Sequence, residues 1–168
     1  MPKIYVVDEN DVVIGVKEKT EVEDHEFNRV TGLWIKNSKG EILLAQRKRT
    51  KRYDPGKWGP AVAGTVEEGE TYESNIIKEA EEELGLRDLE MTIGPKERVT
   101  WAEHRYFAHW FITTLDLPVE AFTIQESEVE AIRWIEFDLF MKDLEENPDQ
   151  YTIGMRNRKK LLPDFMKM

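Results

Sequence analysis

Four glutamates between residues 79 and 83 are the side chains whose type and spacing point most directly to chemistry. A helix turns about 100° per residue, so Glu79, Glu82 and Glu83 share one side, whereas Glu81 points to the other. Like charges at this i, i+3 and i+4 spacing cost a helix roughly a few tenths of a kcal/mol. A hard divalent cation such as Mg²⁺, however, prefers clustered carboxylates. The pattern therefore predicts a metal site, with a solvated acidic face as the alternative.

The segment that carries these glutamates is the clearest predicted helix, over residues 71–84. Thr71 is a suitable N-cap, Glu73 suits the positive end of the helix dipole, and Gly85 stands where a helix commonly ends. Apolar residues recur along the segment with helical spacing. The side chains expected to face the core are Ile76, Ile77, Ala80 and Leu84.

Short apolar runs separated by turn residues predict a mixed β-sheet around this helix, in an α/β (α+β) domain. An N-terminal hairpin is expected over residues 4–16, and Asn37-Ser38-Lys39-Gly40 predicts a tight turn between two strands. The other predicted strands lie at residues 32–36, 41–46, 61–66, 105–114 and 131–136, and the C-terminal helices at residues 137–146 and 154–167.

Composition limits the classes of function. The 168 residues, 40% of them hydrophobic, are enough for one ordinary core, so a single domain over residues 1–168 is expected. The formal charge of −10 disfavours binding to duplex nucleic acid. No membrane-spanning run, secretory signal pattern or cysteine is present. We therefore expect a cytoplasmic protein. An acidic chain can still act on a small phosphorylated molecule when divalent cations lie between its carboxylates and the phosphates.

The spacing around the glutamates resembles the Nudix box. Gly64 is followed after five residues by Glu70 and after seven more by Lys78-Glu79-Ala80-Glu81-Glu82-Glu83-Leu84-Gly85-Leu86. Every specified position matches except Lys78, where the family has arginine. The chain is thus identified as a member of the Nudix hydrolase superfamily, with its box at residues 64–86. The resemblance implies an α/β/α sandwich with a mixed sheet, and Mg²⁺- or Mn²⁺-dependent hydrolysis of a diphosphate linkage.

The resemblance also implies roles for individual residues. Glu79, Glu82 and Glu83 correspond to the metal-binding glutamates of the family, and Glu82 is a candidate catalytic residue as well. The backbone carbonyl of Gly64 corresponds to one that often completes the metal site, and Glu70 stands at the start of the loop–helix turn. In such a site, metal ions neutralise phosphate oxygens and lower the pKa of a bound water.

Two more residues are candidates for catalysis. Lys78 keeps the charge of the family arginine but lacks its planar, two-pronged guanidinium, so a working but slower enzyme is predicted. Glu128 precedes Trp134 by six residues, and the family often has a distal glutamate there as general base or additional ligand. The alternatives for this role are Glu82, Glu103, Glu126 and Glu130.

A basic segment precedes the box. Its cations are Arg47, Lys48, Arg49, Lys51, Arg52 and Lys57. Arg47 and Lys57 are the candidates for substrate binding, because such side chains hold phosphate oxygens; a solvated loop that balances an acidic surface is the alternative. Four aromatic residues are candidates for stacking on a nucleobase, with burial in the core as the alternative: Trp58, Trp101, Tyr106 and Trp110.

Segments outside the box resemble isopentenyl-diphosphate isomerase and the hydrolases similar to it. These segments are residues 7–10, 14–15, 37–47 and 55–58. The isomerase requires a cysteine before the first glycine of the box and a histidine after it, whereas this chain has Ala63 and Thr65. A second family histidine is replaced by Asn28, and His25 alone does not restore the isomerase site.

The sequence therefore favours a hydrolase that cleaves a nucleoside-diphosphate derivative or a related organic diphosphate. One alternative is a Nudix domain that senses nucleotides without turnover. A diphosphate isomerase is the other, and it is disfavoured by the missing cysteine. The sequence leaves open whether the chain forms a homodimer.

Overall fold

Nine β-strands and four α-helices make up the chain, which a computed structural model describes over residues 1–168. The strands are β1 (Lys3–Val7), β2 (Val13–Glu18), β3 (Asn28–Lys36), β4 (Glu41–Arg47), β5 (Trp58–Gly59), β6 (Val62–Thr65), β7 (Thr92–Val99), β8 (Tyr106–Thr114) and β9 (Val129–Glu136). The helices are α1 (Tyr72–Leu84), α2 (Phe137–Glu146), α3 (Ile153–Asn157) and α4 (Leu162–Lys167). Each helix is too short or too polar to cross a lipid bilayer.

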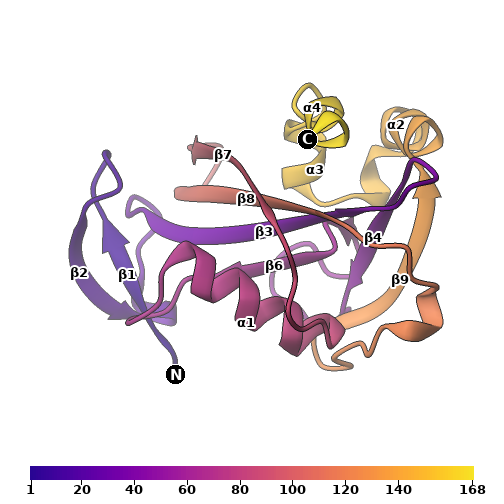
Figure 1. The fold of residues 1–168 in the computed structure, drawn as a ribbon. Helices are drawn as coiled ribbons and strands as arrows, with labels where there is room; N and C mark the ends of the chain where they lie inside the picture. Colours follow the sequence, from indigo (N-terminus) through magenta and orange to yellow (C-terminus); the bar gives the residue numbers. More distant parts are fainter.

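The elements form three layers. The seven-stranded sheet lies between α1 on one face and α2, α3 and α4 on the other, and the β1–β2 hairpin forms a separate two-stranded sheet at one end (Figure 1). This arrangement is the expected α/β/α sandwich. The expected N-terminal hairpin, the helices α1 and α2, and the strands β3, β4, β6, β8 and β9 are confirmed, with shifts of a few residues at several ends.

β3 is the central strand of the large sheet. It pairs in parallel with β8 across nine residue pairs and antiparallel with β6 across four. β4 pairs antiparallel with β9 along most of its length. The strand order is β5-β4-β3-β8-β7, with β6 on β3 and β9 on β4. Because parallel and antiparallel pairs occur together, the sheet is mixed, as predicted.

The turn between β3 and β4 follows from its residues. Asn37 Oδ1 accepts two backbone hydrogen bonds of 3.0 Å, and Gly40 has a φ of 79°, which glycine adopts without strain. Beyond the turn, β3 and β4 pair only through Lys36 and Ile42. The strands then separate, and β6 takes the place beside β3. This divergence brings Gly64 next to the middle of β3.

Side chains on the central strands alternate between the two faces. Leu33 and Ile35 pack in the core beneath α1 with Ile76, whereas Trp34 packs on the opposite face. Its ring stacks on Phe165 of α4 with the centroids 5.4 Å apart. Apolar residues follow one another along these strands because helices cover both faces of the sheet.

The C-terminal segment differs from the single helix expected over residues 154–167. A turn at residues 158–161 separates α3 from α4, and Pro163 lies in the first turn of α4, where its missing N–H costs nothing. Arg158, at the start of this turn, is 6% exposed and donates from Nε to Glu97 Oε2 at 2.6 Å. The expected helix is wrong because its middle is anchored to β7 and its second half begins at a proline.

The apolar spacing of the sequence did not predict two other features of the fold, the exposure of Ile77 and the strand β7. Ile77, expected in the core, is 53% exposed, because the buried face of α1 lies on the other side of Ile76 and includes the fully buried Asn75. The strand β7 has no clear apolar alternation and contains Gly94 and Pro95. It is an edge strand that pairs only with β8, and such positions tolerate proline and charge.

Candidate active site

The ends of α1 are fixed by residues in the box. Thr71 Oγ1 accepts from Ser74 N at 3.0 Å, and Ser74 Oγ accepts from Thr71 N at 2.9 Å, which forms a capping box. At the other end, Gly85 has a φ of 69° and caps the helix in the left-handed conformation. Because both ends are fixed, the glutamates of the last two turns project in defined directions.

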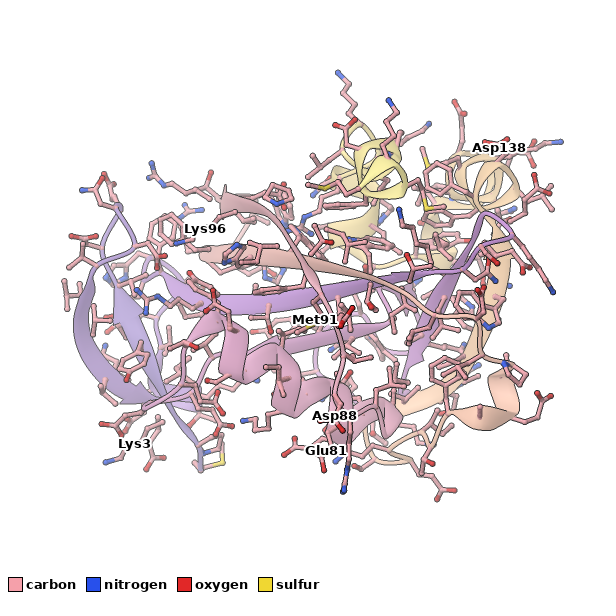
Figure 2. The ribbon with its side chains drawn as sticks, in the orientation of Figure 1. Lys3, Glu81, Asp88, Met91, Lys96 and Asp138 are labelled. Carbon is pink, nitrogen blue, oxygen red and sulfur yellow. The ribbon has the colours of Figure 1, made fainter.

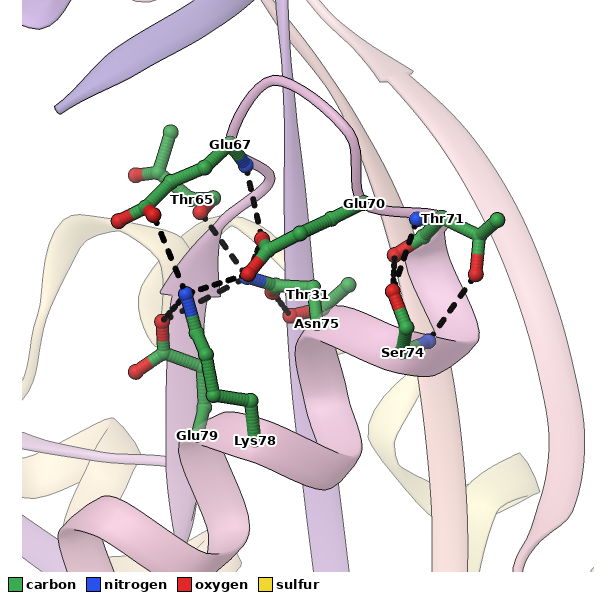
Figure 3. A network of polar contacts seen from close by, with 9 residues as sticks. All are labelled: Thr31, Thr65, Glu67, Glu70, Thr71, Ser74, Asn75, Lys78 and Glu79. Atoms are coloured by element: carbon green, nitrogen blue, oxygen red, sulfur yellow. Dashed lines mark hydrogen bonds and ion pairs between the residues drawn. The ribbon is translucent and has the colours of Figure 1, made fainter.

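Asn75 is a buried amide that joins α1 to the sheet. Its Oδ1 accepts from Thr31 Oγ1 at 2.5 Å (Figure 3). Its Nδ2 donates to Thr65 O at 3.0 Å and to Glu70 Oε2 at 2.9 Å. Buried polar groups are costly unless they are paired, so this network fixes how α1 lies on β3 and β6. Sequence reasoning missed Asn75, although an amide beside an apolar helix stripe was the available signal.

Lys78 ties α1 to the loop that precedes it. Its Nζ lies 2.5 Å from Glu70 Oε1 and 3.4 Å from Glu67 Oε2 (Figure 3). The same ammonium is 3.9 Å from Glu79 Oε1. Burial alone would raise the pKa of Glu70. The hydrogen bonds that Glu70 accepts, of which the one from Lys78 has the largest effect, together outweigh burial, so the pKa of Glu70 lies below its usual value. A single ammonium thus acts on three carboxylates at the position of the family arginine.

Glu79 packs against the backbone of Gly64 in β6. A Cβ added to Gly64 would lie 2.4 Å from Glu79 Cγ, so this close approach requires glycine. The Glu79 side chain is only 15% exposed. Burial raises the pKa of Glu79 to about 7, with the nearby charge of Lys78 opposing the shift and that of Glu82 adding to it. The negative charge of the Glu79 carboxylate is therefore only partly balanced by Lys78.

Glu83 is a second half-buried glutamate, one turn farther along α1. Burial raises its pKa to about 8, and the charges of Glu79 and Glu128 add to the shift. The backbone N–H of Ala63 and the charge of Lys51 oppose it. Glu83 is therefore near the carboxylate of Glu128, in the loop before β9, and near the backbone of Ala63 in β6.

The other two glutamates between residues 79 and 83 differ in direction. Glu82 is exposed at the edge of α1, and its charge acts on Glu79. Glu81 lies on the outer side of α1, away from the sheet (Figure 2), and pairs with Arg87 at 2.7 Å. The predicted separation of Glu81 from the remaining glutamates is therefore confirmed.

The loop before β9 is held against the end of α1. Gln125 N donates to Glu83 O at 3.0 Å, and Glu128 N donates back to Gln125 O at 2.9 Å. On its other side, the Glu128 carbonyl accepts from Lys48 N at 3.1 Å. The Glu128 carboxylate itself accepts from Lys51 Nζ. The distal candidate is thus brought to the same edge of the molecule as Glu83.

The alternatives to Glu128 lie in other surroundings. Glu130 pairs with Lys48 at 3.3 Å. Glu126 and Glu103 are exposed, the first in the loop before β9 and the second in the loop before β8. Of these four glutamates, Glu128 is the one whose charge acts on Glu83.

A cation from the N-terminal hairpin also reaches this edge of the molecule. Lys19 lies in a short 3-10 turn, η1 (Lys19–Glu21), directly after β2. The side chain as a whole is exposed, but protein atoms around its ammonium end lower its pKa. The charges that act on it are those of Lys51, Glu79, Glu128 and Arg47. Sequence reasoning missed Lys19, because no local pattern signals which residues the docked hairpin brings to α1.

The two candidates for substrate binding point in different directions. Arg47 donates from Nε to Tyr53 O at 2.9 Å and lies within electrostatic range of Lys19. Lys57 Nζ donates to Asp149 O, in the segment before α3. The structure therefore brings Arg47 to the edge that carries Glu79 and Glu128, and it directs Lys57 toward the C-terminal segment.

The aromatic candidates for stacking are mostly engaged in packing. Trp110 is 5% exposed and belongs to the core on the face opposite α1. Trp58 has the guanidinium of Arg133 over its ring, 4.3 Å from the centroid. Trp101 and Tyr106 contact each other edge to face, with their centroids 6.3 Å apart. For Trp110, burial in the core is therefore the correct interpretation.

The residues at this site have the chemistry of a divalent-cation site. As the side chains are oriented, no three acidic or histidine residues converge closely enough to form a complete ligand set. Glu79 and Glu83, however, are half-buried glutamates whose pKa values are raised, and the first lies on a glycine that leaves no space for a side chain. Hard oxygen donors with unbalanced negative charge suit Mg²⁺ or Mn²⁺. Glu82 and the carbonyl of Gly64 offer further oxygens.

Known proteins resemble this chain in sequence and fold. The model of the NUDIX domain family matches residues 26–155. An uncharacterized Nudix hydrolase of Pseudomonas aeruginosa is 29% identical over 143 residues, which cover 84% of this chain and 83% of that protein. A solved structure of a Deinococcus radiodurans protein has a TM-score of 0.82 at 19% identity, covering 94% of this chain and 97% of the other. This last likeness shows the fold alone.

An isomerase is also among the relatives. An isopentenyl-diphosphate Delta-isomerase of Pectobacterium atrosepticum is 26% identical over 174 residues, which cover 98% of this chain and 93% of that protein. The resemblance to the isomerase branch is therefore confirmed at low identity, while Ala63 and Thr65 stand at positions where the isomerase requires cysteine and histidine. The matched domain, the related hydrolases and the shared fold place this chain in the Nudix hydrolase family, as a pyrophosphohydrolase that acts on acid anhydrides.

Proposed function

We propose that this enzyme hydrolyses a diphosphate linkage in a nucleoside-diphosphate derivative or a related organic diphosphate, with Mg²⁺ or Mn²⁺ as cofactor. The observation that carries the proposal is the pair of half-buried glutamates, Glu79 and Glu83, which lie on one side of a helix capped at both ends and have raised pKa values. Stability alone does not require two half-buried carboxyl groups on one helix face. A divalent cation would balance both.

The residues proposed to hold the cation are Glu79, Glu82, Glu83 and the carbonyl of Gly64. When bound, a divalent cation supplies neutralisation of phosphate oxygens and lowers the pKa of water. Thr71 and Gly85 hold the helix that carries the three glutamates. Lys78 holds Glu70 and lies near Glu79, so it acts as a positioning residue and does not itself touch the substrate.

Glu128 is proposed as the general base. Its backbone is held on both sides by hydrogen bonds, and its carboxylate lies at the edge of the molecule to which Glu83 belongs. A carboxylate in this position accepts a proton from the water that attacks phosphorus. General-base catalysis of this kind contributes about a hundredfold to ten-thousandfold in rate.

Arg47 and Lys19 are proposed to hold the outer phosphates. Both cations are within electrostatic range of each other, and Lys19 is in range of Glu79 and Glu128 as well. Hydrogen bonds from such cations to phosphate oxygens are about twice as strong as those between neutral groups. In a chain with a formal charge of −10, these two side chains provide a local site for an anionic substrate.

A phosphate-release screen tests the proposal. The substrates are nucleoside triphosphates, dinucleotide polyphosphates, ADP-ribose, nucleotide sugars and isopentenyl diphosphate, each with Mg²⁺ and with Mn²⁺. We expect turnover of at least one diphosphate compound, and a loss of at least about 100-fold in Glu83→Gln. Glu81→Gln is the matched control, because Glu81 lies on the same helix but points away from the sheet; its rate is expected to stay within about twofold of wild type.

The screen also separates the alternatives. Tight nucleotide binding without turnover of any compound would favour a sensor. Conversion of isopentenyl diphosphate into its allylic isomer, without phosphate release, would favour an isomerase. Activity that survives in Glu83→Gln would overturn the assignment of Glu83 as a metal ligand.

A stability measurement gives a readout that does not depend on substrate. With a chelator at pH 7.5, Glu83→Gln is expected to melt above wild type, because an amide avoids burying a charge near Glu79. Addition of Mn²⁺ is expected to raise the melting temperature of wild type and of Glu81→Gln, and to leave that of Glu83→Gln nearly unchanged. Equal stabilisation of all three proteins by Mn²⁺ would contradict the proposed site.

A further inference from the structure

Lys51 and Glu128 form an ion pair beside the proposed metal site. Lys51 Nζ donates to Glu128 Oε2, and the two side chains are 30% and 37% exposed. The charge of Lys51 also acts on Glu83, which feels the charge of Glu128 as well. The charge of Lys51 therefore acts on carboxylates from two elements, through an ion pair with Glu128 in the loop before β9 and without an ion pair on Glu83 of α1.

The ion pair is not what holds the loop of Glu128 in place. Hydrogen bonds of the backbone do so: Glu128 N to Gln125 O at 2.9 Å, and Lys48 N to Glu128 O at 3.1 Å. Gln125 is in turn bound to the carbonyl of Glu83 at the end of α1. What Lys51 supplies is positive charge at the carboxylate oxygens, through a long side chain that readily changes its partner.

The other lysine near the site has a different position. Lys78 contacts Glu70, Glu67 and Glu79, and it lies on α1 itself. Lys51 comes from the segment between β4 and β5 and pairs with Glu128, in the loop before β9. At Glu128, Lys51 provides the positive charge that a divalent cation would also provide.

We propose that Lys51 and the divalent cation oppose each other beside Glu128: the Lys51 ammonium neutralises this carboxylate in the metal-free protein, and it leaves Glu128 when a metal binds to the neighbouring glutamates of α1. The inference rests on the proposed function, because it takes the glutamates of α1 as the metal ligands. Two cations repel each other when both lie beside one carboxylate. Linkage is reciprocal, so an ion pair that opposes metal binding is itself weakened by the metal. The metal affinity is then lower than the carboxylates alone would give.

Isothermal titration of the full chain with Mn²⁺ tests this inference. Lys51→Met is expected to bind Mn²⁺ about threefold to fivefold more tightly than wild type, the range that an exposed ion pair contributes. Lys51→Arg keeps the charge and is expected to bind like wild type. Lys48→Met is the matched control, because Lys48 belongs to the same basic segment but pairs with Glu130; its affinity is expected to change by less than about twofold. Melting with a chelator verifies that each variant is folded.

The sign of the effect decides between competition and positioning. Weaker Mn²⁺ binding in Lys51→Met would mean that the lysine orients Glu128 for the metal, which would overturn the inference. Equal changes in Lys51→Met and Lys48→Met would also overturn it, because the effect would then be that of net charge alone.

Reaction with an acylating reagent, read by mass spectrometry, gives an independent result. A paired ammonium is a poor nucleophile, so Lys51 is expected to react faster after Mn²⁺ is added, while Lys48 is expected to react at the same rate. A Lys51 rate that does not respond to Mn²⁺ would contradict the inference.

Glu83→Gln separates this inference from the proposed function. If wild type does not bind Mn²⁺, or if Glu83→Gln binds it equally well, the metal assignment itself fails. If Mn²⁺ binding depends on Glu83 but Lys51→Met behaves like Lys48→Met, only the inference about Lys51 fails.

Discussion

Lys78 Nζ lies 2.5 Å from Glu70 Oε1, so an ion pair closes the loop between β6 and α1. Glu70 also accepts hydrogen bonds from Glu67 N and Asn75 Nδ2, both at 2.9 Å. The carboxylate is thus bound to its own loop, to the first part of the helix and to the lysine of the box. Glu70 thus holds the loop that leads into α1, and Lys78 extends this contact toward Glu79.

Replacing Lys78 with arginine is predicted to raise activity. A planar guanidinium holds two carboxylates at once, whereas the ammonium is 3.9 Å from Glu79 while it contacts Glu70. We expect kcat of Lys78→Arg to rise about threefold with little change in KM, and that of Lys78→Met to fall below wild type. Steady-state kinetics on one substrate from the screen measures this. An unchanged or lower kcat in Lys78→Arg would show that the departure from arginine has no cost.

A side chain at Gly64 is predicted to displace Glu79. The added Cβ would lie 2.4 Å from Glu79 Cγ and 2.8 Å from its Oε1. We expect Gly64→Ala to lower kcat at least about tenfold and to destabilise the fold by about 1–3 kcal/mol, the usual cost of overpacking. Gly15→Ala is the control, because nothing lies within 4 Å of the corresponding Cβ. Similar losses in both variants, by kinetics and thermal unfolding, would argue against a specific contact.

The parts of the site that sequence predicts are those set by local geometry. Thr71, Gly85 and the spacing of the glutamates can be recognised from the sequence, because they define the two ends and the period of one helix. The separation of Glu81 from Glu79 therefore follows from residue numbers alone. The same periodicity misplaces Ile77, because it leaves the exact centre of the buried arc open. That centre is decided by Asn75, whose partners come from β3, β6 and the preceding loop.

The parts that sequence does not predict depend on contacts between distant segments. Lys19 reaches the site because the hairpin docks through an isolated bridge between Ile4 and Glu67. Lys51 pairs with Glu128 because β4 and β9 are neighbours in the sheet. No local pattern records such pairings, since the same basic residues would form an ordinary solvated loop in another fold.

Removing the charge of Glu128 is predicted to slow hydrolysis. If Glu128 accepts the proton of the attacking water, Glu128→Gln is expected to lower kcat about 100-fold or more while the protein remains folded. Glu130→Gln is the matched control two residues away, in the same chain segment but paired with Lys48; its kcat is expected to stay within about twofold. Full activity of Glu128→Gln would return the role of base to Glu82, Glu103, Glu126 or Glu130.

Asp11 anchors the tip of the N-terminal hairpin to the main sheet. Its carboxylate accepts from Arg29 Nε at 2.7 Å, from Lys96 Nζ at 2.6 Å, and from Tyr72 Oη at 2.9 Å. The side chain is 8% exposed. Burial alone would raise the pKa of Asp11, but the hydrogen bonds from Lys96, Arg29 and Tyr72 outweigh it and lower the pKa below its usual value. The hairpin is thus attached through a carboxylate that folding keeps ionised.

Asp11→Asn is therefore predicted to be less stable than wild type, by an amount that depends on pH. Asparagine tolerates the φ of 63° at this position, so the substitution leaves the backbone unstrained. It removes the charge and replaces one acceptor oxygen with a donor nitrogen. At pH 7 we expect a loss of about 2 kcal/mol. A carboxyl group whose pKa is lowered by folding stabilises the protein above its unfolded pKa of about 4, and this contribution disappears as the pH falls through the folded value. Urea unfolding at pH 7, 5 and 3 should therefore show a gap that is constant between pH 7 and 5 and smaller at pH 3. A gap of the same size at pH 3, or none at pH 7, would mean that the charge of Asp11 does not hold the hairpin.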